Sequence, residues 1–527
     1  MKPPCDEAVI SSGQGGVPCA VQSRTWILIA TILGSSMAFI DGTVVNVALP
    51  ALQSNFHATV ADVQWVVESY GLLLAALILV GGSLGDLFGR RLIFLLGVGL
   101  FALASAACGI ALSIGQLIFA RSIQGVGAAL LVPGSLAIIS ASFDEKSRGQ
   151  AIGTWSGFTA ITTAPGPVLG GWLIQHSSWR WVFFINAPLA AVVIGISFRH
   201  VAESRDSVRE KVDWSGALAA ALGLGSLVNG FIESESEAWQ HPQVWLSIAI
   251  GCLFLCLFLW IEARKRSPMV PLALFRSASF SGANLLTLFL YGAIGIFFFL
   301  FPLNLIQVQK YSATATGTAL LPLILLIFFL SGWSGGLVVR YGSRLPLMIG
   351  PLVAALGFSL FAFPSEGGNY WTSFLPAVIV LGLGMVITVA PLTTVIMNSI
   401  PQDRAGTASG INNAVARVAG VLAIAVFGIV MVKIFGWQLN RSLGRYSLPA
   451  QMLQEIQSHE IDLAAMKPPT GLDPNIRAVV MRSIESAFIY GFRIVMLLCT
   501  ALSLASALVA WLMIPKNPRG PSDAAQD

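Results

Sequence analysis

Apolar runs of about 20 residues recur along almost the whole chain, and short polar segments separate them. A helix of that length spans the roughly 30 Å hydrocarbon core of a bilayer, and backbone groups in lipid must be satisfied within the segment. Charged residues make up 10% of the 527 residues and hydrophobic residues 55%, where soluble domains average about 25% charged residues. The chain is therefore predicted to be an all-α membrane protein.

Fourteen runs are long enough to be counted as spans. They lie near 26–50, 63–85, 91–112, 116–141, 150–174, 180–199, 214–233, 243–262, 280–306, 313–339, 345–363, 371–399, 405–432 and 488–514. Related phrases precede the fifth and thirteenth spans, which suggests parallel halves of the kind found in many secondary carriers. We predict an N-terminal six-helix half over 24–203 and a C-terminal six-helix half over 271–515, with two extra central helices between them over 204–270. Tails over 1–23 and 516–527 complete the chain. The first tail is polar and is expected to be disordered.

Lysine and arginine are concentrated in alternate connections between spans, as at 90–91 and 264–266, whereas the short connections between these carry Arg180 and Lys310. Because positive residues favour the cytoplasmic side, both termini are predicted to be cytoplasmic. The expected location is the plasma membrane, or the inner membrane if the source is bacterial. The long polar segment 433–487 then falls outside, where we expect an amphipathic hairpin or lid.

Asp41 is the only charged residue in the run from Trp26 to Leu52. An aspartate near the middle of a spanning helix costs about 2.5–3.5 kcal/mol on insertion scales. A cost of that size indicates a carboxyl that faces a cavity or a partner, and intramembrane carboxyls commonly serve as proton relays. We therefore assign proton coupling to Asp41. The alternative is a structural aspartate that hydrogen-bonds neighbouring helices.

Arg121 and Glu68 are the other residues expected to take part in proton coupling. A guanidinium is effectively always protonated, so Arg121 in the fourth span could tune a nearby carboxyl but could not carry its proton. The alternative for Arg121 is a structural bond to backbone carbonyls. Glu68 in the second span could share the proton with Asp41, or it could face an interfacial cavity near the outer boundary. We favour the interfacial position.

The connection between the second and third spans is a candidate gate, formed by Gly82, Asp86, Gly89, Arg90 and Arg91. Glycine permits a tight turn, and the carboxyl could accept charge-assisted bonds from the arginines or lie at a helix N-terminus. The alternative is an anchor of positive charge on the cytoplasmic side and nothing more.

A candidate hinge lies in the fifth span, at Pro165, Gly166, Pro167, Gly170 and Gly171. Proline removes a helical hydrogen bond and glycine lowers the cost of distortion, so this segment is expected to bend and to shape the substrate cavity. Small residues also let a neighbouring helix approach closely, which is the alternative interpretation.

Candidates for the lining of that cavity are Asn46, Gln124, Trp155, Phe158 and Arg417. Aromatic ring faces suit cationic or flat apolar molecules. Arg417, in the thirteenth span, has the same two interpretations as Arg121. Asn46 lies about 140° round the helix from Asp41, so we expect it to contact a different neighbour.

Five phrases in this order resemble motifs of the major facilitator superfamily, specifically its fourteen-helix drug:proton antiporter branch of the multidrug efflux type. They are Asp41–Pro50, Gly82–Arg91, Arg121–Ala129, Gly166–Gly171 and Ser178–Pro188, and the resemblance covers 24–515. Two positions depart from the pattern. Thr162 stands where the antiporter motif usually begins with glycine, and Val339 stands in the second half where the first half has Asp86. Only the first-half loop is therefore expected to form an acidic–basic contact.

The resemblance implies a major-facilitator-like bundle that exports small amphipathic or cationic compounds in exchange for protons, by alternating access. It also implies that Asp86 helps to lock the cytoplasmic side while the cavity faces outward. The expected partners are a small-molecule substrate, protons and the lipid bilayer, with a monomer as the working unit. A carrier for a dedicated metabolite or nutrient, and a membrane sensor that transports nothing, are the alternatives.

Other chemistries are not indicated. The sequence has no Gly-x-x-x-x-Gly-Lys-Ser/Thr phosphate loop, which argues against an ATP-driven pump. Its five histidines are scattered without metal-binding spacing, and no nucleophile–base constellation is apparent. We therefore predict no enzyme activity, no cofactor, no metal and no nucleic-acid binding.

Overall fold

A computed structural model describes residues 21–143, 165–205, 213–237, 241–265, 268–364, 369–399, 405–444, 460–466 and 474–516, with 151, 154–155, 158–159, 367, 446, 452–453 and 456 between them. The regular elements over these residues are all helical, which confirms the all-α prediction. The first half holds α2 (Val21–Phe56), α3 (Val60–Phe88), α4 (Arg90–Gly109), α5 (Ile114–Ser142), α7 (Pro165–His176), α8 (Trp181–Phe184) and α9 (Asn186–His200). The inserted pair is α10 (Trp214–Glu237) and α11 (Pro242–Arg264).

The second half follows the short helix η1 (Leu272–Arg276). It holds α12 (Ala278–Leu303), η2 (Asn304–Val308), α13 (Ala313–Ala319), α14 (Leu321–Gly335), α15 (Leu337–Tyr341), α16 (Arg344–Leu360), α17 (Tyr370–Ser373), α18 (Leu375–Asn398), α19 (Ala405–Leu443), η4 (Glu460–Ala465) and α21 (Pro474–Met513). Within the described residues, twelve helices are long and apolar enough to cross a membrane, so the chain is a multi-pass membrane protein. Helix α16 is apolar but shorter, and the predicted fifth span falls largely outside the described residues.

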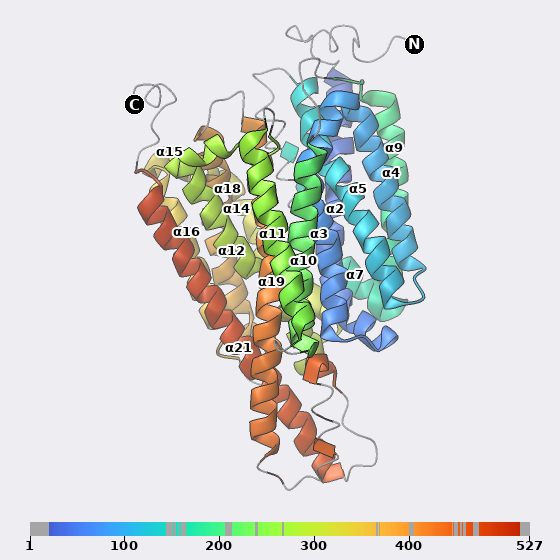
Figure 1. Cartoon of the computed structure of the whole chain (residues 1–527), viewed down its shortest axis with the longest axis vertical. Coiled ribbons are helices and arrows are strands. Elements are labelled where there is room, and N and C mark those ends of the chain that lie inside the picture. Colours follow the sequence, from blue (N-terminus) through green and yellow to red (C-terminus); the bar gives the residue numbers. More distant parts are fainter. Residues whose placement is uncertain are drawn as a thin grey trace.

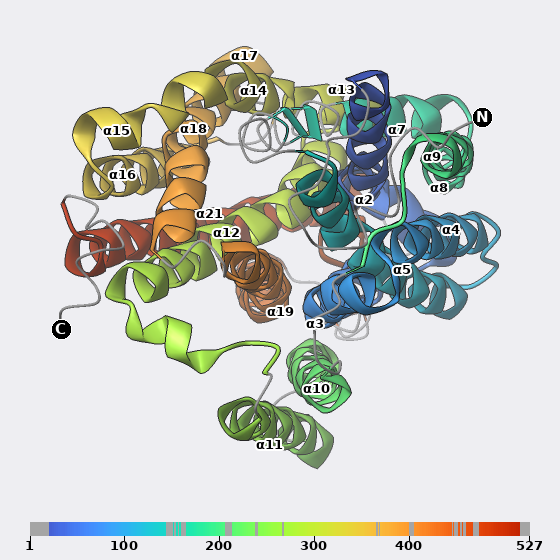
Figure 2. The ribbon, with the colours of Figure 1, turned by 90° about the horizontal axis from the view of Figure 1, so that it is seen from above.

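The two most extensive contacts between the halves are those of α3 with α19 and of α7 with α13, and α2 also contacts α12 and α13. Helix α10 packs against α3, α19 and α11, so the inserted pair lies beside the first of these contacts (Figure 2). The second contact is unusually close, since a Cβ atom added at Gly317 of α13 would lie 2.0 Å from the carbonyl oxygen of Pro167 in α7. Glycine at this position therefore lets the two backbones touch.

Helices α19 and α21 project past the rest of the bundle at one end, which we call the hairpin end (Figure 1). At the opposite end, the terminal end, α2 begins and α21 finishes. The two helices contain 39 and 40 residues, so at 1.5 Å per residue each is about 60 Å long, twice the hydrocarbon core. The predicted span limits at 432 and 488 are therefore wrong as helix limits. Helix α19 ends before Gly444 and α21 begins at Pro474, which are ordinary stop and start signals.

Candidate functional site

A buried ion pair between Asp41 of α2 and Arg121 of α5 forms the centre of the candidate site. The Asp41 side chain is 0% exposed and that of Arg121 is 1% exposed. Arg121 Nη1 donates to Oδ2 of Asp41, and Gln124 Nε2 donates to Oδ1 over 2.8 Å. Asn186 Nδ2 of α9 also approaches Oδ1, at 3.4 Å. The carboxylate is thus surrounded by donors from two other helices of the same half.

Arg121 makes further contacts besides the ion pair. Its Nε atom donates to the carbonyl oxygen of Val66 over 3.1 Å, and its guanidinium carbon lies 4.3 Å from the ring centroid of Tyr70. Nη1 also donates to Gln124 Oε1 over 2.8 Å. The two interpretations offered for Arg121, a partner for a carboxyl and a ligand of a backbone carbonyl, therefore both hold. The guanidinium would keep three partners if Asp41 became neutral.

Asn186 was not among the predicted site residues, although it lies within the resembling phrase 178–188. Its side chain links Asp41 to Ser105, since Nδ2 donates to Ser105 Oγ over 3.0 Å. Ser105 Oγ in turn donates to the carbonyl oxygen of Phe183 over 2.8 Å. An asparagine at the start of an apolar helix is the only sequence signal for this role. The site therefore draws on α2, α4, α5 and α9.

Glu68 of α3 lies apart from this cluster and is also 0% exposed. Neither of its carboxylate oxygens has a hydrogen-bond partner among the described residues. Glu68 follows Val60, the first residue of α3, by eight positions, which places it about 12 Å along the helix. The expectation that it faces an interfacial cavity is not met, because packing against neighbouring helices covers it completely.

The candidate gate has its predicted acidic–basic contact. Arg90 Nε and Nη2 each lie 3.0 Å from Asp86 Oδ1. Gly89 between them has φ +121°, a backbone conformation that other residues adopt with strain. Gly82 contributes no such constraint, because a Cβ atom there would make an ordinary 3.6 Å contact with Pro133. Glycine is therefore required at position 89 but not at position 82.

Arg91 binds the segment after α9 instead of Asp86. Its Nη1 atom donates to the carbonyl oxygen of Val201 over 2.9 Å, and its guanidinium lies 3.9 Å from Glu203. Glu203 also accepts from the backbone amides of Arg91 and Leu92, at 3.0 and 3.1 Å, and so caps the start of α4. Sequence reasoning missed Glu203 because it lies in a polar connection, where an isolated carboxyl has no special meaning.

The predicted hinge residues are used for close packing. A Cβ atom at Gly170 would lie 2.0 Å from Val44 of α2, and one at Gly166 would lie 3.0 Å from Thr43. Gly171 instead faces the other half, where its Cβ atom would lie 2.3 Å from the carbonyl oxygen of Ala313. Pro165 is the first residue of α7, and Pro167 supplies the carbonyl that meets Gly317. Close packing is therefore present, and bending stays a prediction.

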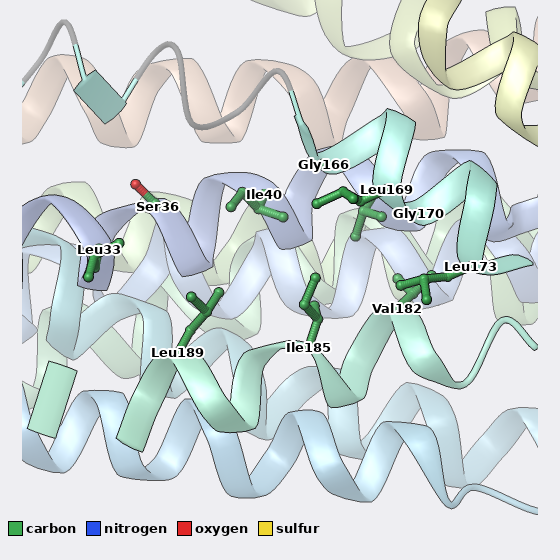
Figure 3. A pocket seen from close by; sticks show the side chains of 11 residues that line it. Leu33, Ser36, Ile40, Gly166, Leu169, Gly170, Leu173, Val182, Ile185 and Leu189 are labelled. Carbon is green, nitrogen blue, oxygen red and sulfur yellow. The ribbon is translucent and has the colours of Figure 1, made fainter. Parts of the chain in front are cut away.

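A cavity of about 240 Å³ lies between α2, α7 and the α8–α9 segment (Figure 3). Leu33, Ile40, Leu169 and Leu189 are among its lining side chains, and Ser36 is the polar one. Gly166 and Gly170 of the candidate hinge also line it. The cavity is therefore apolar and suits a hydrophobic group.

The five predicted cavity residues lie elsewhere. Gln124 belongs to the Asp41 cluster, and Asn46 donates to the carbonyl oxygen of Gly42 in its own helix over 3.2 Å. Trp155 Nε1 donates to Ser35 Oγ over 3.2 Å, and Phe158 is 52% exposed. The guanidinium carbon of Arg417 lies 5.4 Å from the ring centroid of Phe39. None of them lines the cavity in Figure 3.

Hydrogen bonds join the halves at the hairpin end. Gln307 Nε2 donates to Gln53 Oε1 over 2.8 Å, and Gln53 Nε2 donates to the carbonyl oxygen of Asp462 over 3.3 Å. Thr314 Oγ1 of α13 donates to Gln175 Oε1 of α7 over 2.8 Å. With the contact between Gly317 and Pro167, these bonds hold the halves together at this end.

Comparisons with known proteins give a consistent picture. The family model described as Major Facilitator Superfamily matches residues 31–424. The chain is 35% identical over 507 residues to Multidrug resistance protein Stp of Mycobacterium tuberculosis (strain CDC 1551 / Oshkosh), covering 93% of this chain and 92% of the relative. It is 33% identical over 509 residues to the Tetracenomycin C resistance and export protein of Streptomyces glaucescens, covering 95% and 94%.

A solved structure shares the fold at low sequence identity. A bacterial homologue of the human lysosomal transporter Spinster, in its inward-facing and unoccupied conformation, superposes with a TM-score of 0.64 at 16% identity. The match covers 95% of this chain and 100% of that chain.

Proposed function

The chain belongs to the Major Facilitator Superfamily, and from that premise we propose that it exports small amphipathic or cationic compounds by alternating access between its two halves. It is a membrane transporter for drug efflux and not an enzyme. The observation that supports this proposal most strongly is the similarity, over more than nine-tenths of the chain, to relatives named for multidrug resistance and for antibiotic export. The apolar cavity in the first half suits the hydrophobic part of such compounds.

The fourteen-span topology is part of this proposal. Twelve described helices are long enough to span. Helix α16 and the predicted fifth span, which ends in α7, complete the count and give each half six helices. The terminal end is cytoplasmic, as the charge pattern predicts, so the projecting hairpin of α19 and α21 is external. The relatives named above are bacterial, which favours the bacterial inner membrane.

We propose that this conformation, in which the hairpin end is closed, is the one that takes up substrate from the cytoplasm. Gln53, Gln307, Thr314 and Gln175 hold the halves together at the hairpin end, which is the external end in this topology. An exporter loads its substrate in such a state and releases it after the external contacts open. The candidate gate, centred on Asp86 and Arg90, lies at the cytoplasmic end of α3.

Proton coupling is assigned to Asp41. In the closed cluster its carboxylate faces Arg121, Gln124 and Asn186 and is 0% exposed. A proton that entered from outside would neutralise the carboxylate and end the ion pair, while Arg121 kept Val66, Gln124 and Tyr70. Inward proton movement then drives export, with about 2.3 kcal/mol per charge for every 100 mV.

The test is uphill transport by reconstituted protein. Proteoliposomes with an imposed pH gradient should accumulate ethidium, a flat aromatic cation, when they contain the wild-type chain. Asp41→Asn should abolish this accumulation and should keep ethidium exchange without a gradient. Uphill accumulation by Asp41→Asn at the wild-type rate would exclude Asp41 as the coupling group.

A carrier dedicated to one metabolite is the second candidate, because one relative is named for tetracenomycin C. Susceptibility of cells with and without the chain, measured across chemically unrelated compounds, separates the two. Protection against several classes supports a multidrug exporter, and protection against one class supports a dedicated exporter.

A further inference from the structure

Glu68 lies on the face of α3 that packs against α10 and α19. Ala61, Trp65 and Leu72 of α3 belong to an apolar cluster that these three helices share, and they precede Glu68 by seven and three residues and follow it by four, which places them on the same helix face. Members of the cluster on the other two helices include Leu224, Val228, Ile232, Val418, Val421 and Ala425. A Cβ atom at the neighbouring Gly71 would lie 3.1 Å from Val421, which confirms how closely α19 approaches. Helices α3, α10 and α19 meet at the junction of both halves and the inserted pair (Figure 2). The carboxyl, which is 0% exposed, is therefore enclosed at this junction.

Among the described residues, no side chain or backbone group forms a hydrogen bond to either carboxylate oxygen of Glu68. The residues of α10 and α19 in the cluster named above are apolar. The ionisable groups nearest in sequence to the contact are Glu233 on α10 and Arg417 and Lys433 on α19, and none bonds to Glu68. On α3 itself, Tyr70 directs its hydroxyl to the carbonyl oxygen of Ala38 on α2, and Asp62 caps the start of the helix.

A buried carboxylate without donors or a cation costs several kcal/mol, so burial of this kind favours the neutral acid. Asp41 is the contrasting case, because a cation and two amide groups surround it. Glu68 therefore holds its proton while α3, α10 and α19 are packed together.

The contact between α3 and α19 is one of the two most extensive contacts between the halves. Glu68 lies about 12 Å from the hairpin end of α3, so separation of the halves at that end would bring water to its carboxyl. Ionisation would then be favourable. Closure of the halves would in turn require the carboxylate to take a proton back from the same side.

We propose that Glu68 is a second proton-binding site, whose protonation from the hairpin side is required for the halves to close between α3, α10 and α19. The inference rests on the alternating access of the proposed function and adds a titrating group to it. It also gives the inserted pair a role, since α10 covers one side of the carboxyl. One proton bound on closure means that the closed-to-open ratio falls about tenfold for each pH unit above the titration point of the open form.

Spin labels at His176→Cys on α7 and Ala315→Cys on α13 report the distance between these two helices, in protein whose native cysteines have been replaced. Both residues are exposed and lie next to the hydrogen bond between Gln175 and Thr314, which the labels leave in place. The wild-type closed population should fall as the pH rises from 5 to 9. Glu68→Gln and Glu68→Met should both remove that dependence and stay closed, whereas Asp62→Asn on the same helix should titrate like wild type.

A Glu68→Gln population that follows the wild-type pH profile would overturn the inference, and the Met variant covers the case in which Gln fails to fold. The distance measurement needs no drug and no gradient. Its result is therefore separate from the ethidium assay, and Asp41→Asn should lose uphill transport while keeping the pH dependence that Glu68 supplies.

Discussion

A single methyl group at Gly317 should prevent the hairpin end from closing. A Cβ atom at this position would lie 2.0 Å from the carbonyl oxygen of Pro167, whereas real Cβ atoms essentially never come within 3.0 Å. The backbones of α7 and α13 would have to move apart by about 1 Å, since densely packed backbone cannot yield as a side chain can. Overpacking of this kind costs about 1–3 kcal/mol. Because the contact is between the halves, the cost applies to the closed state, and the closed-to-open ratio should fall about 5- to 150-fold.

The assay for Gly317→Ala is the labelling rate of a cysteine at Asn46, which is 8% exposed in the closed state, with a membrane-impermeant maleimide added on the hairpin side. Gly317→Ala should label faster than the parent chain by that factor and should export ethidium more slowly. Gly195→Ala and Gly99→Ala are matched controls, because an added Cβ atom meets nothing within 4 Å at either position. Equal labelling of Gly317→Ala and the controls would refute the argument that this contact closes the halves.

Two further predictions concern stability. Gly89→Ala should lower the melting temperature in detergent, because φ is +121° and the new Cβ atom would lie 2.6 Å from the Glu203 carboxyl. The expected loss of folding free energy is about 1–3 kcal/mol. The control Gly82→Ala has room for the methyl group and should melt like wild type. Burial raises the pKa of Asp213, but hydrogen bonds from Lys265, the Gly216 amide and Ser215 outweigh it and hold that pKa below its ordinary 3.8. The contact therefore stabilises the fold above pH 4 and is lost as the pH falls through that pKa, so Lys265→Met should cost about 0.2–1 kcal/mol at pH 7 and less at pH 3, measured by thermal melts.

The charged residues of the site could be found from the sequence because a charge in an apolar run is costly wherever the helices lie. Asp41 and Arg121 were identified in this way. Their pairing could not be predicted from that cost, since the two residues are 80 positions apart and meet only through the packing of α2 and α5. The same limit applied to Glu68, whose position along the helix was known but whose neighbours, α10 and α19, were not.

Residues that act through backbone geometry left weaker signals. Glu203 caps α4 because the chain after α9 passes the start of that helix. The residues around Glu203 do not predict this contact. Gly171 was predicted as part of a hinge and Gly317 was not singled out, and the close backbone contacts of both become apparent only when α7 and α13 are placed together. Composition thus predicts which segments enter the membrane, and the contacts between them decide which residues matter.

Asp41 and Glu68 differ in how a movement of the halves affects them. Every partner of Asp41, namely Arg121, Gln124 and Asn186, belongs to the first half, so a rigid rotation of one half against the other leaves these contacts unchanged. Its proton uptake must then depend on water or substrate reaching the cluster. Glu68 is covered from the second half by α19 and from the inserted pair by α10, so the same rotation changes its surroundings directly. On this view Asp41 couples the proton to the substrate, and Glu68 couples it to the rotation of the halves. A chain that lost either carboxyl would still bind protons and substrate, but proton uptake would no longer drive substrate export.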